Sequence, residues 1–397
     1  MIYLDNAATT RVRQEVLDKM LPYLTDFYGN PSSIYALGRE AKKAIEDARA
    51  KVAAALSADK NEIYFTGSGT EADNWAIKSA ALSYAGKGKH IIASQVEHHA
   101  VLHTCEALKK EGYEITYLPV DEYGIINPGD LEKAIRPDTI LISVMFANNE
   151  IGSIQPVKEI GRIAREHKVL FHTDAVQAAG HVPINVNEMN IDMLSLSGHK
   201  MYAPKGIGAL YAKQGIKLAP FIHGGAQERK KRAGTENVAN IAALGEAISL
   251  IVSEMDGEAA KAEKLRDKLI NGILTEIPHA RLNGSAKSRL PGNVNISFEF
   301  IEGESLLLLL DMKGIAASSG SACTSGSLDP SHVLMATGLK HEMAHGSLRL
   351  TIGKYNTEEE IDKVLEELPP IVKRLRDMSP LYEQYIKDNI KDKKEGK

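Results

Sequence analysis

The stretch NEIYFTGSGTEADNWAIKSAALSYA, residues 61–85, predicts a strand, a turn and a helix in direct succession. Residues 62–66 are rich in the β-branched and aromatic side chains that strands favour. The glycines, serine and threonine at 67–70 are typical of a turn, and the run that follows is typical of a helix. A strand that leads straight into a helix is the repeating unit of an α/β sheet.

The same alternation continues along the chain. Further short apolar runs of strand type are KHIIAS (89–94), EITYLPV (114–120), TILISVMFA (139–147), VLFHTDAV (169–176), DMLSLSG (192–198) and GIGALYA (206–212). Helical stretches at 99–111, 128–136 and 155–167 separate the earlier ones. The sequence therefore predicts the α/β class, with a mostly parallel sheet flanked by helices on both faces.

The pattern changes after about residue 250. A long helical stretch at 243–274 is followed by the strand-like runs NVNISFEF (293–300) and SLRLTIG (347–353), and by a helix that contains EEEIDKVLEELPPIVKRL (358–375). These elements predict a second, smaller α+β domain.

Composition limits the possible classes of protein. Of the 397 residues, 48 are basic and 52 acidic, a net charge of −4 that gives no strong field for nucleic acid or an anionic membrane. The two cysteines, Cys105 and Cys323, do not suggest a disulfide framework. The N-terminus has no apolar signal core, and no apolar run approaches the roughly 18 residues of a membrane span. We expect a cytoplasmic protein with neither a membrane nor a nucleic acid as partner.

Two stretches offer groups that could bind a ligand. Gly67 and Gly69 lie between a strand and a helix, where free backbone N–H groups suit a phosphate, and Thr70 adds a hydroxyl. The alternative is a plain strand-to-helix connection. Asp174 follows the apolar run VLF, so it should stand at the carboxyl end of a strand, where parallel sheets bind ligands. The alternative is a helix N-cap.

A lysine occupies a similar position on a second strand. Lys200 follows the run DMLSL, with Ser197 and His199 beside it. A solvated lysine is the ordinary interpretation, but burial lowers the pKa of a lysine and makes its amine nucleophilic. A phosphate cradle, a carboxylate and a lysine on one sheet edge are together what pyridoxal phosphate requires.

The sequence resembles the NifS/IscS type of cysteine desulfurase, a fold-type I enzyme of the class V aminotransferase kind. The resemblance reaches from the start of the chain to about residue 370. The stretches that carry it are YLDNAATT (3–10), GNPSS (29–33), TGSGTEADN (66–74), EHHAV (97–101), NNEIG (148–152), HTDAVQ (172–177), SLSGHKMYAPKGIGALY (195–211), HGGAQERKKRAGTEN (223–237), SSGSACTSGSLDPSHVL (318–334) and SLRLTIG (347–353).

The resemblance implies three regions and a set of roles around pyridoxal 5'-phosphate. Residues 1–15 would be an arm joining the small domain, 16–255 the large cofactor-binding domain, and 256–397 the small domain with the cysteine loop. Lys200 would bond to the cofactor's aldehyde, and Asp174 would pair with its ring nitrogen. Gln177 would contact the phenolic oxygen, and His98 would stack on the ring face. His99 is the weaker candidate for the ring face.

The resemblance also implies a phosphate site and a substrate site. The phosphate would be held by Thr70, Ser197 and His199, by the backbone at Gly69 and Gly198, and by Thr235 from a second subunit of a homodimer. Asn149 and Arg349 would hold the carboxylate of L-cysteine, with Asn149 also beside the ring oxygen.

The stretch SSGSACTSG (318–326), rich in glycine and serine, carries the thiol of Cys323 and offers it little to pack against. By the resemblance Cys323 is the catalytic nucleophile, which takes the substrate's sulfur as a persulfide and passes it to an acceptor such as an iron–sulfur scaffold protein. Glycine and serine make the rearrangement of such a loop inexpensive. The expected reaction converts L-cysteine to L-alanine. Selenocysteine lyase or another class V enzyme is the alternative, and a sulfur-handling protein without activity is a third.

HEMAH, residues 341–345, matches the H-E-x-x-H pattern of zinc proteases. The pattern is short, a strand-like run follows it at once, and no third ligand is obvious nearby. We therefore expect no structural metal site, although Cys323 could transiently share an iron–sulfur cluster with a scaffold protein.

Overall fold

A seven-stranded sheet forms the centre of the computed structural model, which describes residues 1–319 and 330–395. Its strand order is β2-β8-β7-β6-β5-β3-β4. The strands are β2 (Ile63–Thr66), β3 (His90–Ser94), β4 (Glu114–Leu118), β5 (Thr139–Ser143), β6 (Leu170–Asp174), β7 (Met193–Ser197) and β8 (Gly208–Ala212). Only β8 runs antiparallel to its neighbours, so the prediction of a mostly parallel α/β sheet is confirmed.

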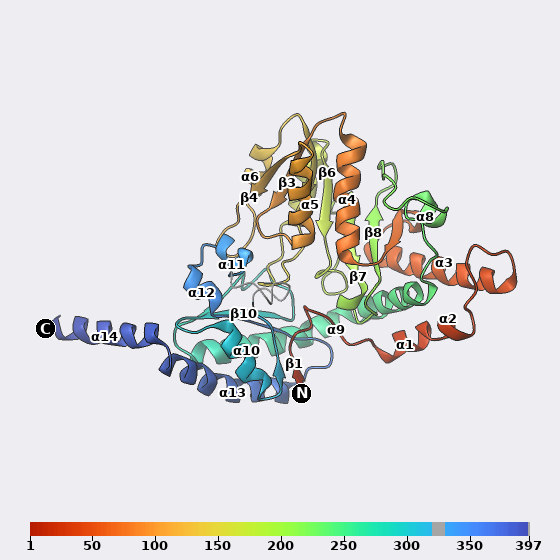
Figure 1. Cartoon of the computed structure of the whole chain (residues 1–397). Coiled ribbons are helices and arrows are strands. Elements are labelled where there is room, and N and C mark those ends of the chain that lie inside the picture. Colours follow the sequence, from red (N-terminus) through yellow and green to blue (C-terminus); the bar gives the residue numbers. More distant parts are fainter. Residues whose placement is uncertain (320–329, 396–397) are drawn as a thin grey trace.

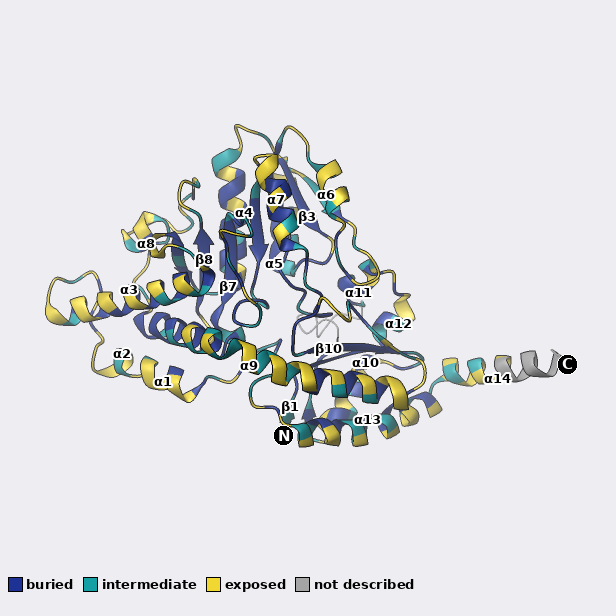
Figure 2. Ribbon diagram, turned by 180° about the vertical axis from the view of Figure 1, so that it is seen from behind, coloured by how far each residue is buried: buried dark blue, intermediate teal, exposed yellow. Residues whose placement is uncertain are grey.

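Helices cover both faces of this sheet (Figure 1). They are α3 (Ala36–Leu56), α4 (Gly69–Tyr84), α5 (His99–Lys110), α6 (Pro128–Ala134) and α7 (Val157–Glu166). Alternate strand residues face opposite ways: Ile92 and Ile142 pack with α3, α6 and α7, whereas Ile91 and Leu141 pack with α4 and α5. The strands are therefore buried on both faces, as Figure 2 shows.

A second hydrophobic core surrounds a three-stranded antiparallel sheet. Its strands are β9 (Ala280–Leu282), β10 (Asn293–Phe298) and β12 (Ser347–Thr351), and α10 (Gly303–Asp311) and α13 (Glu358–Asp377) pack against it. The N-terminal arm joins this part, because β1 (Ile2–Tyr3) pairs with β11 (Ile315–Ala316) and Leu4 is buried in the same core.

A single helix, α9 (Val238–Glu276), belongs to both cores. Ile251 packs in the first core and Leu265 in the second. The predicted boundary at 255/256 falls between them, inside one continuous helix, and the division into domains stays a prediction. Among the described residues, α9 is the helix long and apolar enough to cross a membrane, and 56% of its most apolar stretch is buried inside the fold, as for a core helix.

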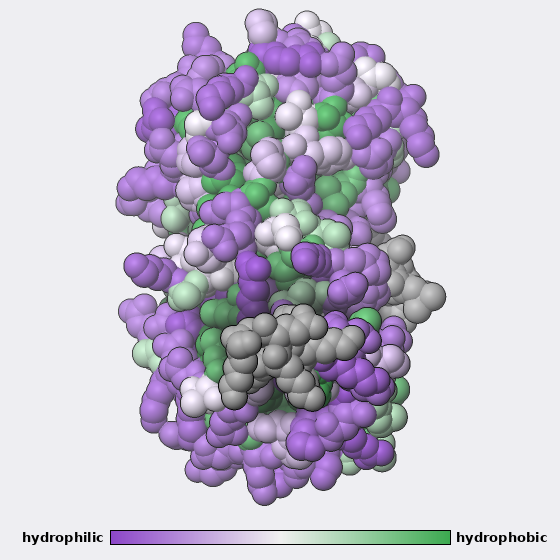
Figure 3. All heavy atoms as spheres, turned by 90° about the vertical axis from the view of Figure 1, so that its left-hand side faces the viewer, coloured by the Kyte–Doolittle hydropathy of each residue, from purple (hydrophilic) through white to green (hydrophobic). Residues whose placement is uncertain are grey.

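The remaining helices lie at the periphery. They are α1 (Gln14–Met20), α2 (Pro22–Thr25), α8 (Gln227–Lys230), α11 (His332–Ala336), α12 (His341–His345) and α14 (Pro380–Glu395), with short 3-10 turns at Lys60–Glu62 and Gly198–Lys200. The helix α14 extends away from the body at the C-terminal end (Figure 1). The face drawn in Figure 3 is mostly hydrophilic, with hydrophobic side chains gathered in small areas.

Candidate active site

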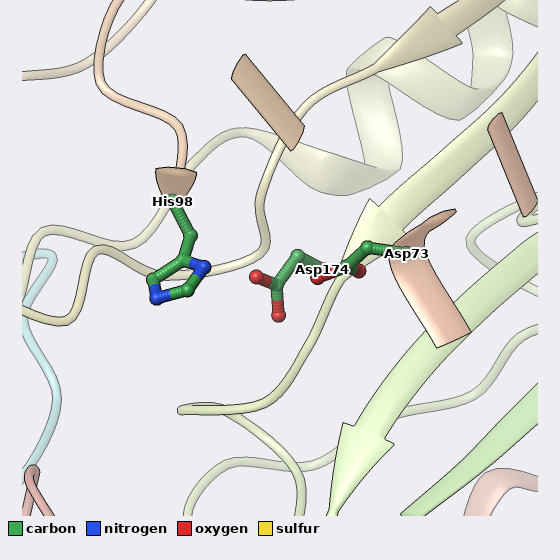
Figure 4. A group of neighbouring side chains, drawn as sticks. All are labelled: Asp73, His98 and Asp174. Carbon is green, nitrogen blue, oxygen red and sulfur yellow. The ribbon is translucent and has the colours of Figure 1, made fainter. Parts of the chain in front are cut away.

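Residues distant in sequence meet at the carboxyl edge of the large sheet. Asp174 is the last residue of β6, Lys200 follows β7 in a 3-10 turn, and His98 stands at the N-terminus of α5. Ligand atoms of Asp73, His98 and Asp174 lie within 4.8 Å of one another. Figure 4 shows the imidazole and the Asp174 carboxylate facing each other, with Asp73 on the far side of Asp174. Lys200 is close enough for its charge to lower the pKa values of both His98 and Asp174.

Asp174 is buried, with 6% of the residue exposed. One of its oxygens, Oδ1, accepts a hydrogen bond from the backbone N–H of Val176 at 2.9 Å. Burial raises the pKa of Asp174 to about 6, although the Val176 bond and the Lys200 charge act in the opposite direction. A positively charged partner at this carboxyl group would favour the anion further.

His98 caps the helix α5. Its Nδ1 accepts a hydrogen bond from the backbone N–H of Ala100 at 3.1 Å, so the proton of the neutral ring is on Nε2. Burial, and then the Lys200 charge, lower the pKa of His98 to about 4, which keeps the ring uncharged at neutral pH. His99, the weaker candidate, packs its ring against His103 and His332 at centroid distances of 5.0 and 4.8 Å.

The N-terminal arm lies against several predicted site residues. The Nζ of Lys200 donates hydrogen bonds to the backbone carbonyls of Ala7 and Ala8, the latter at 2.7 Å. Gln177 Nε2 also donates to Ala7 O, at 3.0 Å, and His199 Nδ1 lies 3.2 Å from Thr9 Oγ1. These contacts of the arm with the sheet edge were not predicted from the sequence.

The helix α4 begins at the site with Gly69, where any larger residue would press against its neighbours. A Cβ at Gly69 would lie 2.5 Å from Cγ2 of Val176 and 3.3 Å from Cβ of Ser197. The missing side chain lets the N-terminus of α4 approach β7, and the first N–H groups of a helix have no partner within it. Gly69, Ser197 and Gly198 are buried here, whereas Thr70 is exposed. This arrangement suits an anion at the helix N-terminus.

These groups fit pyridoxal 5'-phosphate. The site offers an amine for an aldehyde, a buried carboxyl for a ring nitrogen, and a helix N-terminus with a glycine cradle for a phosphate. The fit rests on the chemistry of Lys200, Asp174 and the start of α4.

The predicted substrate arginine is buried on the three-stranded sheet. Arg349 lies on β12 and is 1% exposed. Its Nη1 donates to the backbone carbonyl of Asn149 and its Nη2 to Oδ1 of Asp5, both at 3.0 Å. Asn149 thus meets Arg349 through its backbone, and Asp5 is a partner that the sequence did not suggest.

The two remaining predicted residues lie elsewhere. Thr235 is exposed in the connection before α9. Cys323 lies outside the described residues. The flanks of its segment are described: the backbone N–H of Ser318 donates to Arg349 O at 3.1 Å, and Ser331 Oγ donates to a carboxylate oxygen of Glu150.

Three buried acids near the site were missed by the sequence analysis. Burial raises the pKa of Glu97 to about 8 and that of Glu150 to about 7, and it raises the pKa of Asp73 well above the ordinary value. Asp73, Glu97 and Glu150 stand in TEADN, EHHAV and NNEIG, stretches that carry the family resemblance. This position in the sequence was the signal that could have identified them. Their burial was not visible in the sequence.

Comparison with known proteins agrees with this site. A sequence model of the family Aminotransferase class-V matches residues 2–364. The chain is 61% identical to the cysteine desulfurase IscS of Methanosarcina thermophila, over 96% of this chain and 94% of that protein. It is 58% identical to the protein of the same name from Clostridium botulinum strain Hall, over 98% of both chains.

Solved structures show the same likeness. A NifS-like protein superposes with a TM-score of 0.89 at 39% identity, covering 94% of this chain and 100% of that one. A NifS-like protein from Rickettsia africae gives 0.85 at 31% identity, over 94% and 99%. The chain therefore belongs to the aminotransferase class-V family, among its pyridoxal phosphate-dependent cysteine desulfurases.

Proposed function

We propose that Lys200, Asp174 and His98 act together on the cofactor while Cys323 takes the sulfur of L-cysteine and L-alanine is released. The convergence of the first three at one sheet edge is the observation that carries the proposal. When bound, pyridoxal phosphate supplies an electron sink for the substrate's α-carbon.

The proton steps follow from the surroundings of each group. The Asp174 carboxylate would favour a protonated ring nitrogen in the cofactor, and Lys200 would act as the base at the substrate's α-carbon. The carbonyls of Ala7 and Ala8 accept hydrogen bonds from Nζ, which gives the amine a defined place. His98 is uncharged and has Nδ1 engaged, so Nε2 is the nitrogen that can exchange a proton.

The anionic parts of the ligands have separate partners. In this proposal Arg349 and Asn149 bind the substrate's carboxylate, for which a planar guanidinium is well suited. The phosphate belongs at the start of α4, and its partners would be Gly69, Thr70, Ser197, Gly198 and His199.

The flanks of residues 320–329 support the role of Cys323. Ser318 is bonded to the backbone of Arg349 on one side, and Ser331 is bonded to Glu150 on the other. The described residues on either side of the segment are therefore bonded to Arg349 and to Glu150, the chain neighbour of Asn149. The Cys323 thiolate would attack the substrate's sulfur, so that an S–S bond forms as the carbon–sulfur bond breaks.

Replacement of Cys323 tests this proposal. Cys323→Ala should abolish sulfide release from L-cysteine and leave the bound cofactor and its visible absorbance unchanged. Cys105→Ala is the matched control, because that thiol is buried and burial raises its pKa to about 12. Full turnover by Cys323→Ala would refute the proposal, and turnover of selenocysteine far above that of cysteine would favour the alternative activity.

A homodimer is the proposed state of the enzyme. Large hydrophobic side chains are exposed on α2, directly before it and in the segment between α2 and α3: Leu21, Leu24, Tyr28, Ile34 and Tyr35. Exposed hydrophobic side chains that gather in one segment are typical of an interaction site. Thr235, also exposed, would complete the phosphate site of the second copy. Ile34→Asp should shift sedimentation equilibrium toward the monomer, and an unchanged mass would contradict this interface.

The destination of the sulfur is also a proposal. We infer a cytoplasmic enzyme that passes the Cys323 persulfide to an acceptor such as an iron–sulfur scaffold protein. The ordinary charge balance and the two isolated cysteines support this setting. Transfer of radiolabelled sulfur from the protein to a purified scaffold protein, absent in Cys323→Ala, would test it.

A further inference from the structure

The ion pair between Asp5 and Arg349 joins the N-terminal arm to the substrate side of the site. Oδ1 of Asp5 lies 3.0 Å from Nη2 of Arg349, and the two side chains are 17% and 2% exposed. An ion pair this far from solvent is little screened, and a hydrogen bond between two charged groups is stronger than a neutral one. Its two members are 344 positions apart in the sequence.

The backbone of Asp5 is fixed in place. It forms a parallel bridge with Thr351 on β12, and its carbonyl accepts a hydrogen bond from the N–H of Ala8 at 2.9 Å. The hydroxyl of Tyr3 donates to the same carbonyl at 3.1 Å. The carboxylate of Asp5 is therefore presented from a rigid strand end rather than from a free loop.

The guanidinium of Arg349 has N–H groups to spare. Nη1 donates to the carbonyl of Asn149 and Nη2 to Asp5, while Nε has no partner among the described residues although it is buried. The two bonds fix the plane of the group, and the other N–H bonds of its fork have no partner among the described residues, so a ligand carboxylate could take them.

We propose that Asp5 is a positioning residue that orients the Arg349 guanidinium toward the substrate's carboxylate. The proposal rests on the proposed function, in which Arg349 binds the substrate's carboxylate. Asp5 itself does not touch the substrate. Its effect is to hold a long, rotamer-rich side chain in one geometry before the ligand arrives, which lowers the cost of binding.

An opposite effect is conceivable on charge alone. Asp5 and the substrate both present carboxylates to one guanidinium, so Asp5 could compete with the substrate. Competition predicts tighter substrate binding when Asp5 is removed, and positioning predicts weaker binding. Asp5→Ala and Asp5→Asn separate the two effects, because the amide oxygen of asparagine can still accept the bond from Nη2.

The experiment compares two probes on the cofactor-loaded protein. L-cysteine and cysteamine share a thiol and an amine, but cysteamine has no carboxylate. Their dissociation constants are measured from the change in the cofactor's visible absorbance, in a Cys323→Ala background so that neither probe is consumed. Asp5→Ala should raise the dissociation constant of L-cysteine about tenfold or more. The dissociation constant of cysteamine should change less than about twofold. Asp5→Asn should restore part of the loss.

Controls separate this role from general damage. Asp18→Ala removes an exposed aspartate of α1 that bonds only to Gln14 among the described residues, and it should bind both probes as the parent does. The variants' cofactor content and melting temperatures are recorded alongside. In the double variant Asp5→Ala/Arg349→Gln, L-cysteine should bind as weakly as in Arg349→Gln alone, because Asp5 acts through the arginine.

Three results would overturn the proposal. Equal weakening of both probes would mean that Asp5→Ala disturbs the whole site. Unchanged or tighter binding of L-cysteine would assign Asp5 no role or a competing one. Unchanged binding in Arg349→Gln would remove the premise, and sulfide release by the enzyme with Cys323 intact would then show that the proposed desulfuration stands without it.

Discussion

Glu97 provides a sharp test of how burial controls ionisation near the site. Its side chain is fully buried, and Oε1 accepts hydrogen bonds from the hydroxyl of Ser94 and from the backbone N–H of Met145, at 2.5 and 2.9 Å. Oε2 has no partner among the described residues. Burial outweighs the two bonds and raises the pKa of Glu97 to about 8, so the group is mostly protonated at neutral pH.

The raised pKa makes the fold less stable as the pH rises. In the unfolded chain a glutamate loses its proton near pH 4.3. Between that value and about 8 the folded protein therefore holds one proton more, and its stability falls with increasing pH. Each pH unit costs at most about 1.4 kcal/mol, so the interval from about pH 6.5 to 8 costs up to about 2 kcal/mol. His98, with its pKa lowered to about 4, is neutral throughout this interval.

Glu97→Gln keeps the acceptor of the two bonds and removes the titration. Urea unfolding of the cofactor-free protein at several pH values gives the free energy of unfolding for each variant. Relative to the parent, Glu97→Gln should gain up to about 2 kcal/mol between about pH 6.5 and 8. Glu111→Gln, at an exposed site, is the control, and its free energy of unfolding should change with pH as that of the parent does. Parallel curves for Glu97→Gln would show that Glu97 is already ionised at about pH 6.5, and the reasoning from burial would be refuted.

Two further substitutions test the packing around the site. Gly69→Ala places a Cβ 2.5 Å from Cγ2 of Val176, so α4 or the Val176 side chain must move, and titration of the cofactor-free protein should show cofactor affinity reduced about tenfold or more. Gly86→Ala, which meets nothing within 4 Å, should leave that affinity unchanged, and equal affinities for the two variants would contradict the cradle. Glu228→Gln removes the buried carboxylate partner of Arg49, which then keeps only the half-exposed Glu46, and breaking such a buried pair should cost about 3–5 kcal/mol, visible as a lower melting temperature. A melting temperature within about a degree of the parent's would contradict the burial of this pair.

Much of the architecture was predictable because its signals are local. Strands buried on both faces appear as continuous apolar runs, and a polar residue directly after such a run lies at the sheet edge. Asp174 and Lys200 were placed correctly at the ends of β6 and β7 for this reason. The contact of Asp5 with Arg349 has no local signal, since 344 positions separate them and the pairing of β1 with β11 and of Asp5 with Thr351 brings them together.

The charges of the site are a second property that residue types do not determine. Asp73, Glu97 and Asp174 are all aspartate or glutamate, and burial raises the pKa of each. Lys200 opposes that effect at Asp174, and Asp174 in turn raises the pKa values of Asp73 and Glu97. Two close buried carboxyls do not both ionise, so the negative charge settles on the acid that has a cation beside it. The fold thus concentrates one anion at Asp174, opposite His98, from three acids that the sequence alone counts as equal.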